Sequence, residues 1–185
     1  MTVHAPARHK QKLLQSAIRL FRRQGFAATG LTEILKNSKA PKGSLYYYFP
    51  NGKEELGAAS VAAAGKTVLK TLEQLEQETS TAPDFVNRYC TLLADWIRLS
   101  GYRDGCPIST VLLEMSPTSA PITKAGQQAF KSWKEVMIRV YRRDNLPEDQ
   151  ARLKATRLMA AIQGAILIAR VEQSPEALEA VAGLV

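Results

Sequence analysis

Residues 42–49, KGSLYYYF, gather side chains that could bind a polyanion. Lys42 carries a positive charge, and Gly43 leaves room for another backbone to approach closely. Tyrosine rings pack against apolar groups and can still donate an O–H to a phosphate oxygen. Backbone amides at the start of a helix also favour a phosphate. The chemistry of this stretch therefore suits phosphate groups.

The same eight residues fit either a β-strand or two turns of helix. Aromatic runs bounded by Gly and Pro are typical of strands. In a helix, Leu45 and Phe49 share one face because they are four residues apart. Periodicity leaves both structures open, but nothing else in the chain reads as a strand, and a lone strand is not stable. We therefore expect a helix that ends at Pro50.

The charge of the chain is concentrated in its first third. The net charge is +8 at pH 7. Residues 1–56 hold ten Lys and Arg against three acidic residues, a balance of +7, whereas the remaining residues hold fifteen against fourteen. Such asymmetry is typical of a module that meets a polyanion. A solvated basic face explains the charge equally well.

Hydrophobic periodicity and turn residues predict an all-α chain of about nine helices. The first three span residues 10–24, 31–38 and 42–49, and the others are expected over residues 53–78, 82–99, 108–115, 122–144, 147–172 and 174–184. The first three, with a glycine turn after the first, match a helix-turn-helix unit, whose last helix enters the DNA major groove. No apolar run is long enough to span a bilayer, so no membrane partner is expected.

A longer pattern around these helices resembles the TetR family of bacterial transcriptional repressors. Residues 19–56 read RLFRRQGFAATGLTEILKNSKAPKGSLYYYFPNGKEEL. The positions that match the family pattern are Phe21, Gly25, Phe26, Thr29, Ile34, Lys42, Gly43, Ser44, Leu45, Tyr46, Phe49, Lys53, Glu54 and Leu56. The later segment GCPISTVLLE, residues 105–114, resembles the lincomycin-resistance and multidrug subgroup. Asn37-Ser38-Lys39 departs from the alanine and glycine usual at the turn before the third helix.

The resemblance implies DNA contacts from the third helix and phosphate contacts from two positions outside it. The first set comprises Lys42, Gly43, Ser44, Tyr46, Tyr47 and Tyr48, and the second comprises Thr29 and Lys53. Leu45 and Phe49 would lie in the core. Tyr48 is close to the Leu45 face of the helix, so contact with the groove and packing in the core both stay open for it.

For residues 53–185 the resemblance implies an effector-binding and dimerisation domain, which follows a DNA-binding domain of residues 1–52. Proteins of this family act as homodimers. The best candidate for the interface is the small-residue helix over residues 155–172, completed by the last helix and its symmetry mates. The interface residues we expect are Leu158, Ala161, Ile162, Ala165, Ile166, Leu178 and Val181. A core helix within one chain is the alternative.

Apolar and aromatic residues on the middle helices are candidates for the effector pocket, and a small apolar or aromatic effector would suit them. They are Trp96, Cys106, Ile108, Leu112, Phe130, Trp133 and Met137. Such residues at helical spacing also serve as plain core, which is the alternative for each. Asp95 and Glu114 lie among apolar neighbours, where they could face a cationic effector or be solvated or ion-paired.

These features predict a ligand-responsive DNA-binding repressor. The dimer would hold double-stranded operator DNA until an effector shifts the fourth helix, spreads the two heads and releases the DNA. A TetR-like protein that acts as an activator, or one without DNA binding, is the alternative.

An enzyme is not expected, and neither is a cofactor or a metal. Both histidines, His4 and His9, lie in an N-terminal segment expected to be flexible, so the body of the chain has no Ser–His or Cys–His pair. Cys90 and Cys106 form no CxxC motif. The N-terminus lacks an apolar signal stretch, and we expect a cytoplasmic protein.

Overall fold

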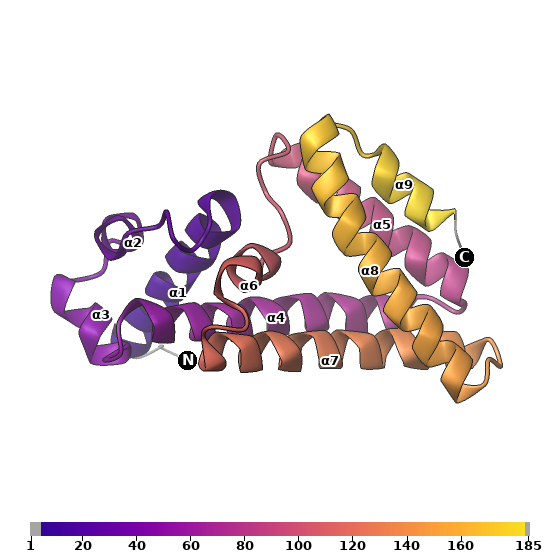
Figure 1. The fold of residues 1–185 in the computed structure, drawn as a ribbon, viewed down its shortest axis with the longest axis horizontal. Coiled ribbons are helices and arrows are strands. Elements are labelled where there is room, and N and C mark those ends of the chain that lie inside the picture. Colours follow the sequence, from indigo (N-terminus) through magenta and orange to yellow (C-terminus); the bar gives the residue numbers. More distant parts are fainter. Residues whose placement is uncertain (1–4, 184–185) are drawn as a thin grey trace. The chain divides into compact units, whose positions relative to one another are not determined.

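A computed structural model describes residues 5–183, with side chains from residue 8 onward. This range contains nine α-helices and no strand, which confirms the all-α prediction (Figure 1). The helices are α1 (Ala5–Gln24), α2 (Leu31–Ser38), α3 (Lys42–Tyr48), α4 (Lys53–Glu78), α5 (Ala82–Leu99), α6 (Ser109–Met115), α7 (Ala120–Arg143), α8 (Glu148–Glu172) and α9 (Glu176–Ala182).

Helix α1 begins five residues before the predicted start at Lys10. Pro6 is compatible with this extension because a proline in the first helical turn forfeits no intrahelical hydrogen bond. His9 therefore lies in a helix rather than in the flexible segment that we expected. His4 lies outside the described residues.

The chain divides into two compact units, which are described separately. The first unit comprises residues 1–66 and 107–129, and the second comprises residues 67–106 and 130–185. Helices α4 and α7 contribute their N-terminal parts to the first unit and their C-terminal parts to the second. The functional boundary that we predicted after residue 52 falls inside the first unit, and it stays a prediction.

In the first unit, α1 packs against both α2 and α3. Leu13, Ala17 and Phe21 recur at helical spacing on α1 and are fully buried. Also fully buried are Ile34 on α2, Leu45 on α3 and Phe49, which follows α3. The Ser16 hydroxyl donates a buried hydrogen bond of 3.1 Å to the Ile34 carbonyl. Gly25 then ends α1 in a left-handed conformation, with φ at +91°, as a helix C-terminus favours.

The turn between α2 and α3 is built without a glycine. Lys39 adopts φ of +53° there, a left-handed conformation that costs an L-residue about 1–2 kcal/mol. The buried Ser38 side chain supports this turn, since its hydroxyl donates to Leu35 O at 3.0 Å and accepts from Ala40 N–H at 3.2 Å. The departure from the family pattern at this turn therefore leaves the two-helix geometry in place.

The stretch that could have been a strand is helical. Phe49 N–H donates to Leu45 O at 2.8 Å, which closes the last turn of α3 before Pro50. Both Leu45 and Phe49 are almost completely buried.

In the second unit, α5, α8 and α9 pack together. Thr81 caps the start of α5, because its Oγ1 accepts a hydrogen bond from Asp84 N–H. The core of this unit contains one apolar face of each helix, with Phe85, Val86, Leu93 and Ile97 from α5, Ala155, Leu158, Ile162 and Ala169 from α8, and Leu178 and Val181 from α9.

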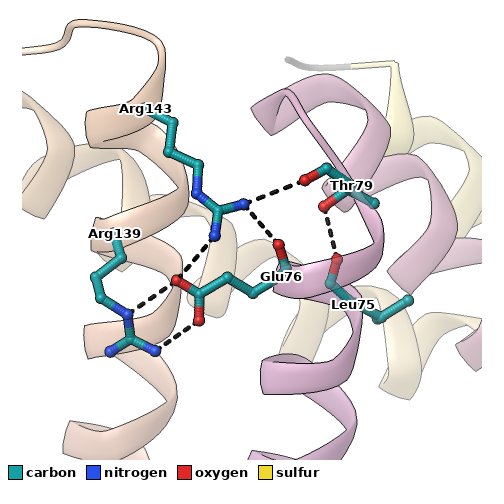
Figure 2. Close-up of polar contacts among 5 residues, drawn as sticks. All are labelled: Leu75, Glu76, Thr79, Arg139 and Arg143. Carbon is teal, nitrogen blue, oxygen red and sulfur yellow. Dashed lines mark hydrogen bonds and ion pairs between the residues drawn. The ribbon is translucent and has the colours of Figure 1, made fainter.

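A buried carboxylate joins α4 to α7 within the second unit (Figure 2). Glu76 accepts two hydrogen bonds from the Arg139 guanidinium, at 2.9 and 2.6 Å. The Arg143 guanidinium lies 3.3 Å from the same carboxylate. Arg143 also donates to the carbonyls of Glu76 and Thr79, at 2.6 and 3.2 Å. The Arg143 guanidinium thus gives hydrogen-bond partners to carbonyls at the C-terminal end of α4. Its positive charge is also favourable there because of the helix dipole.

We predict that Glu76→Ala destabilises the protein by about 1–3 kcal/mol, because it removes the shared partner of two arginines that remain partly exposed to water. The midpoint of urea unfolding at pH 7 measures this change. Glu73→Ala is the matched control: Glu73 is exposed on the same helix, so it removes an equal charge and should cost at most about 0.5 kcal/mol. Equal shifts for the two variants would contradict the assignment.

Candidate nucleic-acid interface

One side of α3 faces outward and carries the residues predicted to contact DNA. Gly43, Tyr46 and Tyr47 are three and four residues apart, so they share a helical face. Tyr46 is 61% exposed and Tyr47 is 77% exposed. Lys42 is exposed at the start of the helix. This surface therefore presents the Lys42 ammonium and the phenol groups of Tyr46 and Tyr47, with no side chain at Gly43.

The N-terminal turn of α3 is open around Gly43. A Cβ added at Gly43 would have no neighbouring atom within 4 Å, so the fold itself does not require glycine at this position. Ser44 is half-buried, and its hydroxyl donates to Pro41 O at 2.6 Å. This bond within the turn engages the hydroxyl proton of Ser44, and the predicted contact of Ser44 with DNA stays a prediction.

Tyr48 lies between the exposed face and the core. It is half-buried, and its ring packs edge-on against the Tyr47 ring with the centroids 4.8 Å apart. Aromatic pairs favour this geometry. Tyr48 is therefore placed to hold the Tyr47 ring, while a contact of its own with DNA stays a prediction.

The two residues predicted to contact phosphates outside α3 both contact the turn between α1 and α2. Thr29 is fully buried, and its hydroxyl donates to Gly25 O at 2.6 Å, so its side chain faces the protein rather than a phosphate. The Lys53 ammonium donates to Ala27 O at 3.2 Å and lies 4.5 Å from the centre of the Phe26 ring. Burial lowers the pKa of Lys53, and the nearby Glu114 opposes that change.

Glu114 was expected in the effector domain, yet its carboxylate binds the same turn. Oε1 accepts from Phe26 N–H at 2.9 Å, and Oε2 accepts from Ala27 N–H at 2.6 Å. Glu114 is exposed to solvent, as the solvated alternative expected, but none of the alternatives included its two hydrogen bonds to the backbone. Asp95 is exposed and forms an ion pair of 2.8 Å with Arg98, which matches the ion-paired alternative. No sequence signal links Glu114 to residues 26 and 27, because the bonds span 87 and 88 positions.

The residues predicted for the effector pocket are divided between the two units. Ile108 and Leu112 belong to the first, where Leu112 packs against Gly126 of α7. In the second unit, Cys106, Trp133 and Met137 are buried and the Phe130 ring lies 5.5 Å from that of Trp133. Trp96 is 44% exposed. A common pocket for these seven residues stays a prediction.

A group of thiols and phenols lies inside the second unit. Burial raises the pKa of the Cys90 thiol to about 11. Burial also raises the pKa of Tyr89, with smaller contributions from Cys106 and Cys90. The pKa of Tyr141 is raised mainly by burial, with smaller contributions from Cys90 and Asp144. Cys90, Tyr89 and Tyr141 are therefore uncharged at neutral pH, and a protonated thiol such as that of Cys90 is a poor nucleophile.

Most of the residues predicted for the dimer interface are buried within one chain. Six of the seven, all except Ala161, lie in the core of the second unit, which corresponds to the core-helix alternative. Helix α8 has a second apolar side that is exposed. From Ala160 onward its residues follow helical spacing, and they are Ala160, Gly164, Leu167, Ile168 and Val171. Leu153 lies seven residues before Ala160, with the polar Thr156 and Arg157 between them. The sequence pattern alone did not separate these two faces, because small and apolar residues occur on both.

Two family descriptions match this chain. "Bacterial regulatory proteins, tetR family" matches residues 13–59, and "Transcriptional regulator LmrA/YxaF-like, C-terminal domain" matches residues 82–183. The first includes α2 and the whole of α3 with its outward face. The second includes α5 to α9.

Similar proteins of known sequence are also regulators. The uncharacterised HTH-type transcriptional regulator YxaF of Bacillus subtilis is 35% identical over 159 residues, which cover 86% of this chain and 83% of YxaF. The HTH-type transcriptional regulator LmrA of the same organism is 31% identical over 159 residues, covering 86% of this chain and 85% of LmrA. These relatives are transcriptional regulators and not enzymes.

Solved structures share the fold over nearly the whole chain. A regulatory protein TetR from Rhodobacter sphaeroides superposes with a TM-score of 0.84 at 24% identity, over 94% of each chain. The reduced form of Escherichia coli NemR gives 0.81 at 25% identity, over 95% of this chain and 94% of NemR. None of the helices within residues 5–183 combines the length and apolar character needed to cross a membrane. The chain belongs to the TetR family of bacterial transcriptional regulators and carries an LmrA/YxaF-like C-terminal domain.

Proposed function

We propose that this protein is a repressor that binds operator DNA as a homodimer and releases it when a small effector binds. The observation that carries the proposal is the outward face of α3, where Lys42, Gly43, Tyr46 and Tyr47 lie on an otherwise anchored helix. Repression, as opposed to activation, is supported by a relative, the HTH-type transcriptional repressor DhaR of a Mycobacterium species, which is 27% identical over 180 residues. A protein of this kind works on the chromosome, so we propose a cytoplasmic location.

In the proposed complex, α3 lies in the major groove of double-stranded DNA. Lys42 neutralises a phosphate, and Gly43 lets the DNA backbone approach the helix. Tyr46 and Tyr47 can donate their hydroxyls while their rings contact sugars or bases. The exposed Lys36 and Lys39, on α2 and in the turn after it, add charge to the same head. Ser44, Tyr48 and Lys53 remain proposed contacts, whereas the buried Thr29 side chain supports the turn.

The second copy in the proposed dimer covers the exposed apolar side of α8. Paired antiparallel about a two-fold axis, two α8 helices would bring the start of each helix to the end of the other. The start carries the exposed basic residues Arg152, Lys154 and Arg157. The end and the following helix carry the exposed acidic residues Glu172, Glu176 and Glu179. The start also carries Glu148, which pairs with Arg152, and Asp149, and the end also carries Arg170. With these included, the start has a net charge of +1 and the end a net charge of −2, so the two ends are opposite in sign in this arrangement.

The proposed effector is small, uncharged, and apolar or aromatic. A ligand in the interior of the second unit would meet aromatic rings and the uncharged groups of Cys90, Tyr89 and Tyr141. The buried carboxylate there, Glu76, is already paired with two arginines. A charged ligand would therefore lose its hydration without a free partner. The effector must favour the DNA-free arrangement, because only a difference in affinity shifts the population.

The proposal is tested by fluorescence anisotropy with a labelled duplex from the promoter of the protein's own gene. We expect sequence-preferring binding that weakens as salt rises, since bound lysines displace counterions from phosphates. Equal affinity for a scrambled duplex, or no binding, would leave the alternative of a module without DNA binding. If transcription from that promoter rises when the protein binds, the alternative of a TetR-like activator would be favoured.

We predict that Gly43→Ala weakens promoter binding roughly tenfold or more, because its methyl group would lie between α3 and the DNA backbone. The same change should leave unfolding free energy unchanged or raise it by up to about 1 kcal/mol, since alanine favours a helix and the space is open. Gln127→Ala, exposed on α7, is the control and should bind like wild type. Wild-type affinity in Gly43→Ala would place the DNA elsewhere.

We predict that Leu167→Glu converts the dimer into monomers of 20.4 kDa, as measured by light scattering after gel filtration. Leu167 is 62% exposed in the single chain, so the fold should persist while a charge enters the apolar interface, at a cost of about 2 kcal/mol or more. Leu113→Glu, on the exposed side of α6, should keep the dimer mass. If Leu167→Glu also keeps that mass, the exposed side of α8 is not the interface.

A further inference from the structure

The turn between α1 and α2 is held by a carboxylate from a distant part of the sequence. Both oxygens of Glu114, on α6, accept from successive backbone amides of the turn, at 2.9 Å from Phe26 N and 2.6 Å from Ala27 N. Hydrogen bonds to an ionised acceptor are stronger than bonds between neutral groups. A pair that engages both oxygens also fixes the direction of the turn.

Gly25 completes the site for this carboxylate. A Cβ at Gly25 would overlap Glu114 Oε1, and the φ of +91° already disfavours any other residue. The glycine therefore serves two purposes: it ends α1, and it admits the carboxylate. The glycine turn after the first helix was predicted from the sequence, but the approach of Glu114 to it was not.

The turn is held from a second side by Lys53. Its ammonium donates to Ala27 O at 3.2 Å, and the amide of the same residue donates to Glu114. Thr29 closes the turn internally through its bond to Gly25 O. The backbone of residues 25–29 is thus bonded by three side chains, and Glu114 is the one supplied by α6.

Helix α6 is itself seated firmly within the first unit. Ile108, which precedes it, and Val111 are buried. The Leu112 side chain lies so close to Gly126 that a Cβ there would overlap it. The segment Gly105-Cys106-Pro107 is separated from α6 only by Ile108. A shift of α6 would therefore carry Glu114 with it, and both of its hydrogen bonds would be lost together.

We propose that Glu114 is a positioning residue that couples α6 to the DNA-binding head. With the carboxylate on Phe26 and Ala27, the turn holds α2 and α3 in the arrangement that binds DNA. When α6 moves, the turn is released and operator affinity falls. This inference rests on the proposed DNA-binding function and adds the residue that transmits the change.

The test compares Glu114→Ala, Gly25→Ala and the double variant by promoter affinity under conditions where circular dichroism shows each to be folded. Coupling between sites is typically 5- to 150-fold, so we expect each single variant to bind roughly 5- to 150-fold more weakly. Both changes break the same contact. The promoter affinity of the double variant should therefore equal, within about threefold, that of whichever single variant binds less tightly. Glu114→Gln, which keeps one acceptor oxygen, should give an intermediate loss.

Two controls separate this role from general effects. Leu113→Ala, next to Glu114 and 85% exposed, should bind like wild type. Gly52→Ala has a similar positive φ of +71° with no neighbour near an added Cβ, so it reports the backbone strain alone. Wild-type affinity in Glu114→Ala, or losses that multiply in the double variant, would overturn the proposal.

Amide hydrogen exchange keeps this test independent of the proposed function. In Glu114→Ala, the amides of Phe26 and Ala27 should exchange faster, while those in the middle of α1 keep their protection. If the wild-type protein fails to bind its promoter, the repressor function fails, yet the exchange result still decides whether Glu114 holds the turn. Unchanged exchange at both amides, or a uniform loss across α1, would overturn the positioning role.

Discussion

Burial of Leu45 and Phe49 is the constraint on which the DNA-binding surface depends. Helix α3 has only seven residues, and a helix this short is not stable alone in water. Each anchor contributes about 1.5–3 kcal/mol when buried. Once these two side chains face the α1–α2 core, the helical repeat turns Gly43, Tyr46 and Tyr47 outward. Exposure of two large aromatic rings is then a consequence of the fold, and such exposure is typical of surfaces that meet a partner.

The rest of the head keeps this short helix in place. The left-handed Lys39 sets the entry into α3, and the turn at residues 25–29 sets the position of α2 against α1. Backbone groups in that turn are bonded by Thr29, Lys53 and Glu114 rather than by regular secondary structure. Polar side chains thus hold the parts of the head that the apolar core does not reach. In the mechanism that we propose, this division of roles lets the head be stable and still respond to a movement of α6.

The sequence predicted the elements well and the placement of distant side chains poorly. Helical periodicity, glycine turns and proline boundaries are local signals, and they placed most helix ends within two residues; α1 was missed at its start. Leu45 and Phe49 were correctly predicted as core for the same reason. Glu114 was assigned to the effector domain, because a bond across 88 residues leaves no local trace. On α8 the pattern could not separate two apolar sides, and the residues chosen for the interface are mostly core.

Photo-cross-linking from position 47 tests directly whether the outward face of α3 contacts DNA. Tyr47 is 77% exposed and does not anchor α3, so a benzoyl-phenylalanine there should leave the fold intact. If α3 lies in the major groove, the probe should form a covalent adduct with bases of the promoter duplex, in two half-sites about ten base pairs or a multiple of that apart. The same probe at exposed position 113 should give no DNA adduct. A protein that binds the promoter but forms no adduct from position 47 would show that the outward face of α3 does not contact DNA.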